Sequence, residues 1–201
     1  MAKVWGPMGW ITLHAVGAAY PHTPNSIEKE NAKKFLEYFT DTITCKYCKD
    51  HFLRIHMSYR SQYPDYLDNK SNFFIFTLRA HNEVNRSLDK PVINSVSSCL
   101  ESLKNATALN RPSYFKDSYM SYLIRTWAHD MTGDALIYKG KAITMRELLS
   151  SLDLKDPFNF EIEEADVTSF RLVFSKAPSQ FISFSTSGAK VGFSGGKLKL
   201  R

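Results

Sequence analysis

The two cysteines of the run Cys45-Lys46-Tyr47-Cys48 are the residues of this chain best suited to do chemistry. Their three-residue spacing brings two sulfur atoms within reach of a disulfide bond. If the pair opens a helix, the helix dipole and its free N–H groups stabilise a thiolate, and Lys46 and Lys49 add positive charge nearby. The spacing therefore indicates redox or metal chemistry.

Three kinds of site use a C-x-x-C pair. A thioredoxin-like site requires the pair to follow a strand, whereas here it lies between two amphipathic helical patterns. A zinc site would use Cys45, Cys48 and His51, with Cys99 or His56 as the fourth ligand, but it lacks the usual second pair at close spacing. A dithiol–disulfide redox site needs no further ligand, and zinc stays as an alternative.

Other polar residues lie on helix faces that are otherwise apolar. His81 and Asn85 are one turn apart, and His14 shares a face with Trp10. Polar side chains that face a core need polar partners. They are either satisfied core groups or contacts to a buried polar ligand such as a purine and ribose, and the spacing alone leaves both interpretations open.

Helical periodicity predicts the elements that would position these groups. Apolar residues recur at helical spacing with charges opposite, and Pro21, Pro91 and Gly133 mark ends. Ser26 and Thr44 are plausible N-caps. We expect a loose connection over residues 92–112, with one helical turn near Cys99. Helices are predicted over residues 8–20, about 71–88 and 114–131, together with one that follows Ser26 and carries an apolar stripe from Ala32 to Ile43 and one that follows Thr44 and carries Cys48 to Tyr59 along one line.

The pattern changes after Gly133, so we place a first, helical domain at residues 1–133. Residues 136–143 predict a short hairpin, and Thr144-x-x-Glu147 predicts a capping box that opens a short helix. Residues 168–201 are rich in Ser, Gly and Lys and fit either small strands, at 170–174 and 181–184, or a mobile tail. Residues 134–201 are thus expected to be a C-terminal extension, small or partly disordered.

The net charge of +6 is confined to the end of the chain. No Asp or Glu lies between Phe170 and Arg201, whereas acidic and basic residues are equal in number before Phe170. A basic tail from about residue 170 could contact nucleic-acid phosphates, but a solvated end is the simpler interpretation.

The composition and the beginning of the chain limit the class of protein to which it can belong. A hydrophobic fraction of 43% predicts a folded core rather than disorder. No stretch approaches the roughly 20 apolar residues of a membrane span. The residues after Met1 lack the pattern of a signal peptide, so we expect an intracellular compartment, most simply the cytoplasm.

Taken together, the motifs resemble the Erv/ALR family of FAD-linked sulfhydryl oxidases. The resemblance covers residues 4–91, continues loosely to Trp127 and does not include residues 134–201. It implies an all-α fold, a four-helix bundle with a fifth helix, which holds FAD beside the C-x-x-C pair. The matched residues are Trp5-Gly6-Pro7, Trp10, Leu13-His14, Tyr20-Pro21, Cys45-x-x-Cys48-x-x-His51-Phe52 and His81-Asn82-x-Val84-Asn85-x-x-Leu88-x-Lys90-Pro91.

The resemblance also implies a role for each matched residue. Cys45 would be the outer cysteine that a substrate dithiol attacks, and Cys48 the cysteine beside the flavin. Electrons would pass from protein dithiols through this pair to FAD and then to oxygen, giving hydrogen peroxide. No resident metal is implied. The residues that would line the FAD site are Trp5, Gly6, Trp10, His14, Tyr20, Cys48, His51, His81, Asn82, Val84, Asn85, Lys90 and Trp127.

The chain departs from this family in two respects. Many members carry a second cysteine pair as a shuttle, whereas Cys99 is single, so a protein dithiol or a small dithiol relay protein would reach Cys45 directly. Leu78 stands where a cysteine of a structural disulfide would be, so packing must replace it. With the unmatched extension, these departures resemble the versions encoded by large DNA viruses. That resemblance implies a place in the host cytoplasm or the virion, and the family implies a homodimer.

Two other functions remain as alternatives. The first is a flavin-free dithiol carrier or zinc-binding helical module, which would differ in colour and metal content. The second is a virion or nucleic-acid-binding protein that acts through its basic tail. It predicts salt-sensitive binding that is lost when residues 170–201 are removed.

Overall fold

The structure is built from helices that pack around a shared hydrophobic core. The computed structural model describes residues 2–173, and this part contains α-helices, one 3-10 turn and no strand, which confirms the all-α fold class. Within the same residues no helix is both long and apolar enough to cross a membrane. The elements are α1 (Ala2–Ala19), α2 (Ser26–Thr42), α3 (Lys46–Gln62), α4 (Lys70–Ser87), α5 (Val96–Ala106), α6 (Pro112–His129), α7 (Ala135–Leu148) and η1 (Leu149–Ser151).

Side-chain caps set where α2 and α3 begin, and each cap lies one residue away from the predicted cap. Asn25, not Ser26, caps α2: its side chain accepts from the Glu28 N–H, and the Glu28 carboxylate accepts from the Asn25 N–H. Cys45, not Thr44, caps α3, because its Sγ accepts from the Cys48 N–H at 3.2 Å. Cys48 therefore lies in the first turn of α3.

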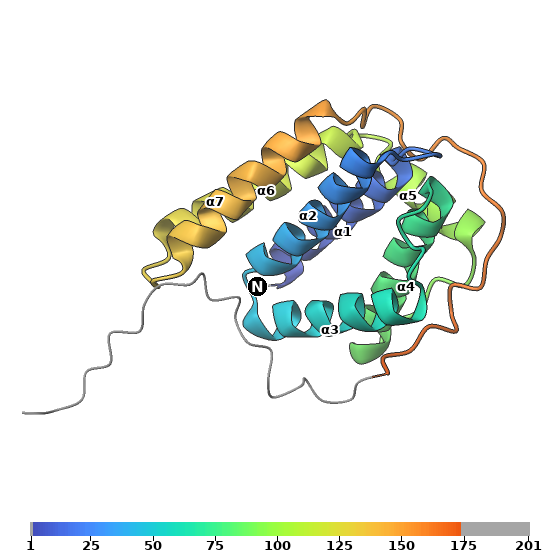
Figure 1. Ribbon diagram of the computed structural model, residues 1–201, viewed down its shortest axis with the longest axis horizontal. Helices are drawn as coiled ribbons and strands as arrows, with labels where there is room; N and C mark the ends of the chain where they lie inside the picture. Colours follow the sequence, from blue (N-terminus) through green and yellow to red (C-terminus); the bar gives the residue numbers. More distant parts are fainter. Residues whose placement is uncertain (1, 174–201) are drawn as a thin grey trace, which may run out of the picture.

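Helix α1 runs through the middle of the molecule, with α4 on one side and α6 on the other (Figure 1). The α1–α4 contact is close at Gly17, where a Cβ atom would lie 3.1 Å from Thr77 Cγ2 and 3.3 Å from Phe74 Cα. Only glycine allows this approach without a shift of α4. Leu78, on the same part of α4, is fully buried, as its expected packing role requires.

The prediction of a hairpin over residues 136–143 is wrong, because these residues belong to α7. A buried stripe at helical spacing, Ala135, Ala142, Met145 and then Leu149, packs in the same core cluster as the bundle. Leu136 and Ile137, which lie in the segment predicted as a hairpin, are exposed. Contact with α2 and α6 overrides local β-propensity here.

Residue Thr144 lies within α7 and opens no new helix, so the predicted capping box is also wrong. The domain boundary near residue 133 stays a prediction, but α7 shares the core of residues 1–133. In α6 the buried residues include Tyr119, Leu123 and Trp127, as the periodicity predicts.

The loose connection expected over residues 92–112 contains a full helix, α5. Ser95 caps it by accepting from the Ser98 N–H, and Val96, Cys99, Leu100 and Leu103 form its buried stripe. These four residues join a second hydrophobic cluster with parts of α1 and α4.

After η1 the chain continues without regular structure along the outside of α5 and α4 (Figure 1). Leu154, Phe158, Val167 and Phe170 are nevertheless buried in this segment. No strand forms over residues 170–173. The expected strand at 181–184 and most of the basic tail lie outside the described residues.

Candidate functional site

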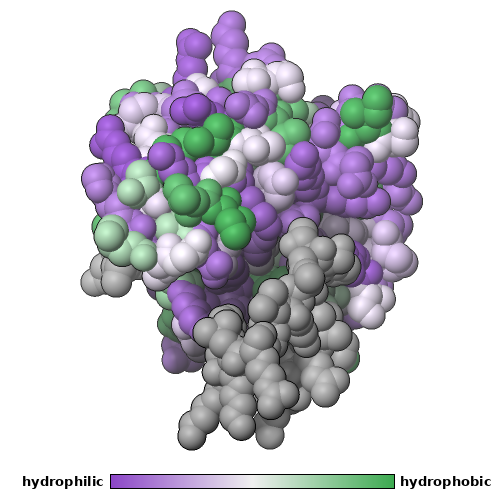
Figure 2. Space-filling model, turned by 60° about the vertical axis from the view of Figure 1, so that its left-hand side comes forward, coloured by the Kyte–Doolittle hydropathy of each residue, from purple (hydrophilic) through white to green (hydrophobic). Residues whose placement is uncertain are grey.

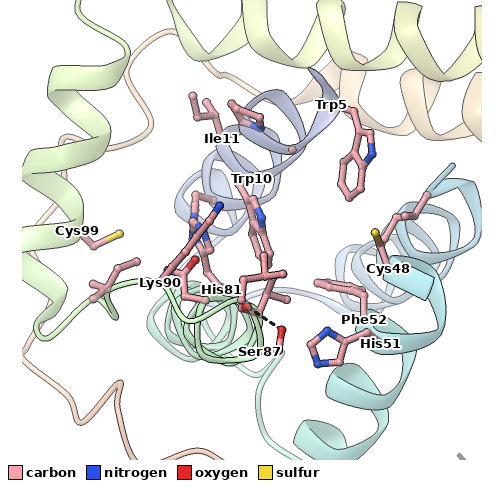
Figure 3. Close-up of a pocket in the computed structure, with 18 of the residues that line it drawn as sticks. Trp5, Trp10, Ile11, Cys48, His51, Phe52, His81, Ser87, Lys90 and Cys99 are labelled. Atoms are coloured by element: carbon pink, nitrogen blue, oxygen red, sulfur yellow. Dashed lines mark hydrogen bonds between the residues drawn. The ribbon is translucent and has the colours of Figure 1, made fainter. Parts of the chain in front are cut away.

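A cavity of about 670 Å³ lies between α1, α3, α4 and α5 (Figure 3). Its volume falls within the usual range for small-molecule sites, about 300–1,000 Å³. Cys48 and Trp5 lie at one end of the view and Cys99 at the other, with Trp10 and His81 between them. The lining residues are Trp5, Gly6, Pro7, Trp10, Ile11, His14, Phe39, Ile43, Tyr47, Cys48, His51, Phe52, His81, Val84, Asn85, Ser87, Leu88, Lys90, Ile93, Cys99, Ser102, Leu103 and Ala106.

Cys45 and Cys48 form a disulfide at the N-terminus of α3. Cys48 lines the cavity and Cys45 does not, so the two sulfurs differ in what they can reach. The helix N-terminus favours a thiolate on Cys48 when the bond opens. The lysines expected to add positive charge are paired: Lys46 Nζ lies 2.9 Å from Asp50, and Lys49 Nζ lies 3.7 Å from Asp41. Both ammonium groups therefore lie beside a carboxylate, which offsets their positive charge near the disulfide.

A chain of hydrogen bonds fixes the proton positions of two cavity histidines. The Thr77 hydroxyl donates to the Phe74 carbonyl at 2.7 Å, so its oxygen accepts from His14 Nδ1–H at 2.8 Å. His14 Nε2 is then the acceptor in its 3.0 Å bond to His81 Nδ1. It follows that His81 carries its proton on Nδ1 and keeps Nε2 as an acceptor for a ligand, a tautomer assigned from the network.

Burial keeps these histidines neutral, as the hydrogen-bond chain requires. It lowers the pKa of His81 to about 4, with a smaller contribution from Lys90, and it lowers the pKa of His14 well below its ordinary value. Burial, followed by the nearby Arg54 guanidinium, also lowers the pKa of His51. His81 thus offers a ligand an acceptor at Nε2, and the neutral imidazoles add no charge to the wall.

The wall of the cavity suits flat aromatic rings. The Trp10 ring is stacked on His81, with centroids 4.0 Å apart and planes 6° from parallel. Trp5 Nε1–H is buried and has no acceptor within residues 2–173. A buried donor without a partner in the wall of a cavity is a group that a ligand atom can satisfy.

These groups fit FAD, which combines two flat ring systems with polar edges and an anionic diphosphate. Apolar and aromatic surfaces match the rings, and Trp5 Nε1–H and His81 Nε2 match a polar edge as donor and acceptor. The exposed ammonium of Lys90 at the rim can meet a negative charge. The orphaned indole N–H is the specific feature that the bound cofactor would explain.

Most residues predicted to line a cofactor site meet in this cavity. Cys45 adjoins it through the disulfide, although it is not part of the wall. The predicted residues that the structure brings to the wall are Trp5, Gly6, Trp10, His14, Cys48, His51, His81, Val84, Asn85 and Lys90.

Three predicted lining residues are not part of the wall. The Tyr20 hydroxyl donates to the Leu67 carbonyl at 3.0 Å and so anchors the end of α1. Asn82 is fully buried and bonds the backbone of Ile93. Trp127 Nε1–H donates to the Thr42 carbonyl at 3.0 Å, which ties α6 to the end of α2. The contacts of all three lie within the protein, and their predicted role at the cofactor stays a prediction.

Missing from the predicted site is the wall that α5 contributes. Cys99 and Leu103 lie on the buried stripe of α5, and this spacing is visible in the sequence once residues 96–106 are tested for helical periodicity. Burial raises the pKa of Cys99 to about 12, so its thiol is not activated. The lining residues Tyr47, Ile43 and Phe39 follow from their places beside Cys48 and along α2.

The cysteines also bear on the zinc alternative. Within residues 2–173 no three His, Cys, Asp or Glu side chains are grouped so that they could hold a metal ion. The disulfide engages the two thiols that a zinc site would need as thiolates.

Comparison with known proteins places the chain in a family. Residues 7–106, from α1 to the end of α5, match the Erv1/Alr family. An "FAD-linked sulfhydryl oxidase" of African swine fever virus is 33% identical over 90 residues, which cover 45% of this chain and 72% of the relative. The "Mitochondrial FAD-linked sulfhydryl oxidase ERV1" of Saccharomyces cerevisiae is 30% identical over 86 residues, 43% of each chain. No solved structure matches. The chain therefore belongs to the Erv1/Alr family.

Proposed function

We propose that this protein is an FAD-linked sulfhydryl oxidase that converts protein dithiols into disulfides and passes the electrons through FAD to oxygen, giving hydrogen peroxide. One observation carries the proposal: of the two cysteines in the disulfide at the N-terminus of α3, Cys48 lies in the wall of a cavity that fits FAD. The names of the viral and yeast relatives agree with this activity.

The two cysteines take different parts in the exchange. A substrate thiolate attacks Cys45 Sγ, the Cys45–Cys48 bond breaks, and a mixed disulfide forms between the substrate and Cys45. Cys48 leaves as a thiolate at the N-terminus of α3, where the helix dipole stabilises it. The second substrate thiol, as a thiolate, then attacks the substrate sulfur of the mixed disulfide, which releases the oxidised substrate and the Cys45 thiolate.

When bound, FAD would accept the two electrons of the Cys45–Cys48 dithiol and deliver them to oxygen. The chain's own part is to hold the cofactor and to keep water from the rings. Trp10 and the neutral His81 supply flat surface and an acceptor, and Trp5 supplies a donor. The remaining residues proposed for the FAD site are Gly6, His14, His51, Val84, Asn85 and Lys90.

The partners and the location are proposals of the same kind. A protein dithiol, or a small dithiol relay protein, would supply electrons to Cys45, and the viral relatives favour the host cytoplasm or the virion. The homodimer stays a prediction. Because α6 and α7 pack against α1 and α2, a second subunit would bind outside the face that they cover. The face shown in Figure 2 carries hydrophobic residues in groups among hydrophilic ones.

The visible absorption spectrum of the purified protein tests the proposal first. Flavin bands that bleach with a dithiol and return in air are expected. In Cys48→Ser the bands should remain, but the dithiol should no longer bleach them. Of the C-x-x-C pair, only Cys48 lines the cavity, and this variant lacks its thiol. Wild-type turnover in Cys48→Ser would refute the mechanism. A colourless protein, still colourless after refolding with FAD, would refute the function and favour a flavin-free dithiol carrier.

A further inference from the structure

The segment after η1, residues 152–173, is held firmly although it has no regular structure. We call it the strap. It lies entirely outside the part of the chain that matches the family, residues 7–106. Val167 and Phe170 are almost fully buried, and Phe170 packs edge-on against Tyr59 at 5.0 Å. The strap therefore belongs to the folded core, and its contacts need an explanation beyond those of a linker.

One set of strap contacts is at the N-terminus of α5. The Glu164 carboxylate accepts from the Val96 N–H and from the Ser97 N–H, each at 2.8 Å, and from the Ser97 hydroxyl. These are first-turn N–H groups with no partner inside the helix. A carboxylate at this end is also favoured by the helix dipole. Glu164 thus fixes the start of a helix that forms one wall of the cavity.

A second set of contacts fixes the segment between α4 and α5. The Asn82 amide donates to the carbonyls of Ile93 and Val167, both at 2.8 Å, and its oxygen accepts from the Ile93 N–H at 2.7 Å. Ile93 lines the cavity, and Val167 belongs to the strap. Since Asn82 is fully buried, each of these bonds would be costly to lose. The wall and the strap therefore share one buried amide.

A third set joins the strap to α4. Arg79 Nε–H donates to the Asp166 carbonyl at 2.9 Å, and Arg86 Nη1–H donates to the Phe170 carbonyl at 3.1 Å. Both arginines arise from the helix that carries His81 and Asn85. The strap thus spans α4 and α5 on the side away from the cavity.

We propose that the strap holds α5 and the Ile93 segment against the cavity, so that Glu164 is a positioning residue for the cofactor site. This inference rests on the proposed function, because it assigns FAD to that cavity. A helix of 11 residues is marginal by itself, so its place depends on what it packs against. If α5 is in place in only a fraction of molecules, the apparent association constant for the cofactor is the intrinsic one multiplied by that fraction.

The test compares Glu164→Ala with Glu163→Ala, which removes an exposed carboxylate one residue away. The first readout is the dissociation constant of FAD, measured by quenching of flavin fluorescence. The second is hydrogen–deuterium exchange of the α5 amides in the apoprotein, which does not depend on the cofactor. We expect Glu164→Ala to weaken FAD binding roughly fivefold and to speed exchange at Val96 and Ser97. Glu163→Ala should leave both unchanged.

The outcomes separate the inference from the function beneath it. If the wild-type protein binds FAD and Glu164→Ala matches it in affinity and in α5 exchange, the inference is overturned while the proposed function stands. The same holds if exchange quickens but FAD affinity does not change, because α5 would then not determine the site. If the wild-type protein binds no FAD, the proposed function fails, and the assignment of Glu164 to a cofactor site fails with it.

Discussion

Replacing Thr77 by Val should invert the polarity of the atom that His81 presents to the cofactor. Thr77 lies outside the cavity wall and is fully buried, and its hydroxyl is the acceptor that holds the proton of His14 on Nδ1. Valine has nearly the same shape but no oxygen. Without that acceptor, His14 satisfies its N–H better by moving the proton to Nε2, where it meets His81 Nδ1. His81 Nδ1 must then accept, and its own proton moves to Nε2.

The size of the effect follows from burial. A ligand group that donates to His81 Nε2 in the wild type would face another donor in Thr77→Val. Leaving a buried donor without an acceptor costs about 1–3 kcal/mol, which corresponds to a roughly 5- to 150-fold weaker affinity. Burial keeps the pKa of His81 at about 4, so a change in its charge near neutral pH would not offset the loss.

Thr77→Ser is the matched control, because it keeps the hydroxyl and removes only the methyl group, which lies close to Gly17. We expect Thr77→Ser to bind FAD nearly as the wild type does and Thr77→Val to bind it at least several-fold more weakly. Titration of each apoprotein with FAD measures this, and nitrogen chemical shifts of the imidazoles report the tautomer. Equal affinities for the two variants would refute the hydrogen-bond chain as the device that orients His81.

Two further predictions concern the same site and its surroundings. Trp5→Phe removes the unpaired indole N–H and should weaken FAD binding. Trp127→Phe is the control: it removes an indole N–H already bonded to Thr42, so it should lower the apoprotein's stability and leave FAD affinity unchanged. Equal FAD affinities for the two variants would count against a ligand contact at Trp5. Burial lowers the pKa of both His56 and His81 to about 4. Because the unfolded chain takes up protons below about pH 6.5 and these folded histidines do not, apoprotein stability should fall between about pH 6.5 and 4, by roughly 1.4 kcal/mol per pH unit for each histidine. The urea concentration at the midpoint of unfolding, measured across this pH range, would stay constant if the two histidines did not destabilise the folded apoprotein.

The sequence predicts the bundle well because its helices carry their own signal. Phe35, Leu36 and Phe39 on α2, and Phe52 and Ile55 on α3, recur at helical spacing and are all buried. The strap carries no such periodicity. Its position depends on pairs such as Glu164 with Val96, which lie 68 residues apart, and no local pattern indicates them. The hairpin error at α7 has the same origin in part, since one of its partner surfaces, on α2, is distant in sequence.

Asn82 lies outside the cavity wall for a different reason. His81 and Asn85 are one turn apart and do share the cavity, as helical geometry requires. Asn82 follows His81 directly, so it points about 100° away around the helix. The resemblance assigned Asn82 to the cofactor, whereas helix geometry alone would have placed it on another face. A motif shows which residues belong together, but the helical period decides which of them can touch one ligand.

Helix α4 thus contacts the cavity with one face and the strap with another, and the site depends on both faces. One face gives His81 and Asn85 to the cavity, and the other gives Asn82 and Arg86 to the strap. Two groups of the wall are held by hydrogen bonds: the His81 ring by His14, and the Ile93 backbone by Asn82. Because a cofactor site is only as well defined as the groups that hold its walls, residues 152–173 belong to the site's structure although they contribute nothing to its lining. The part of this chain that matches the family supplies the chemistry, and the part beyond it stabilises the place where that chemistry occurs.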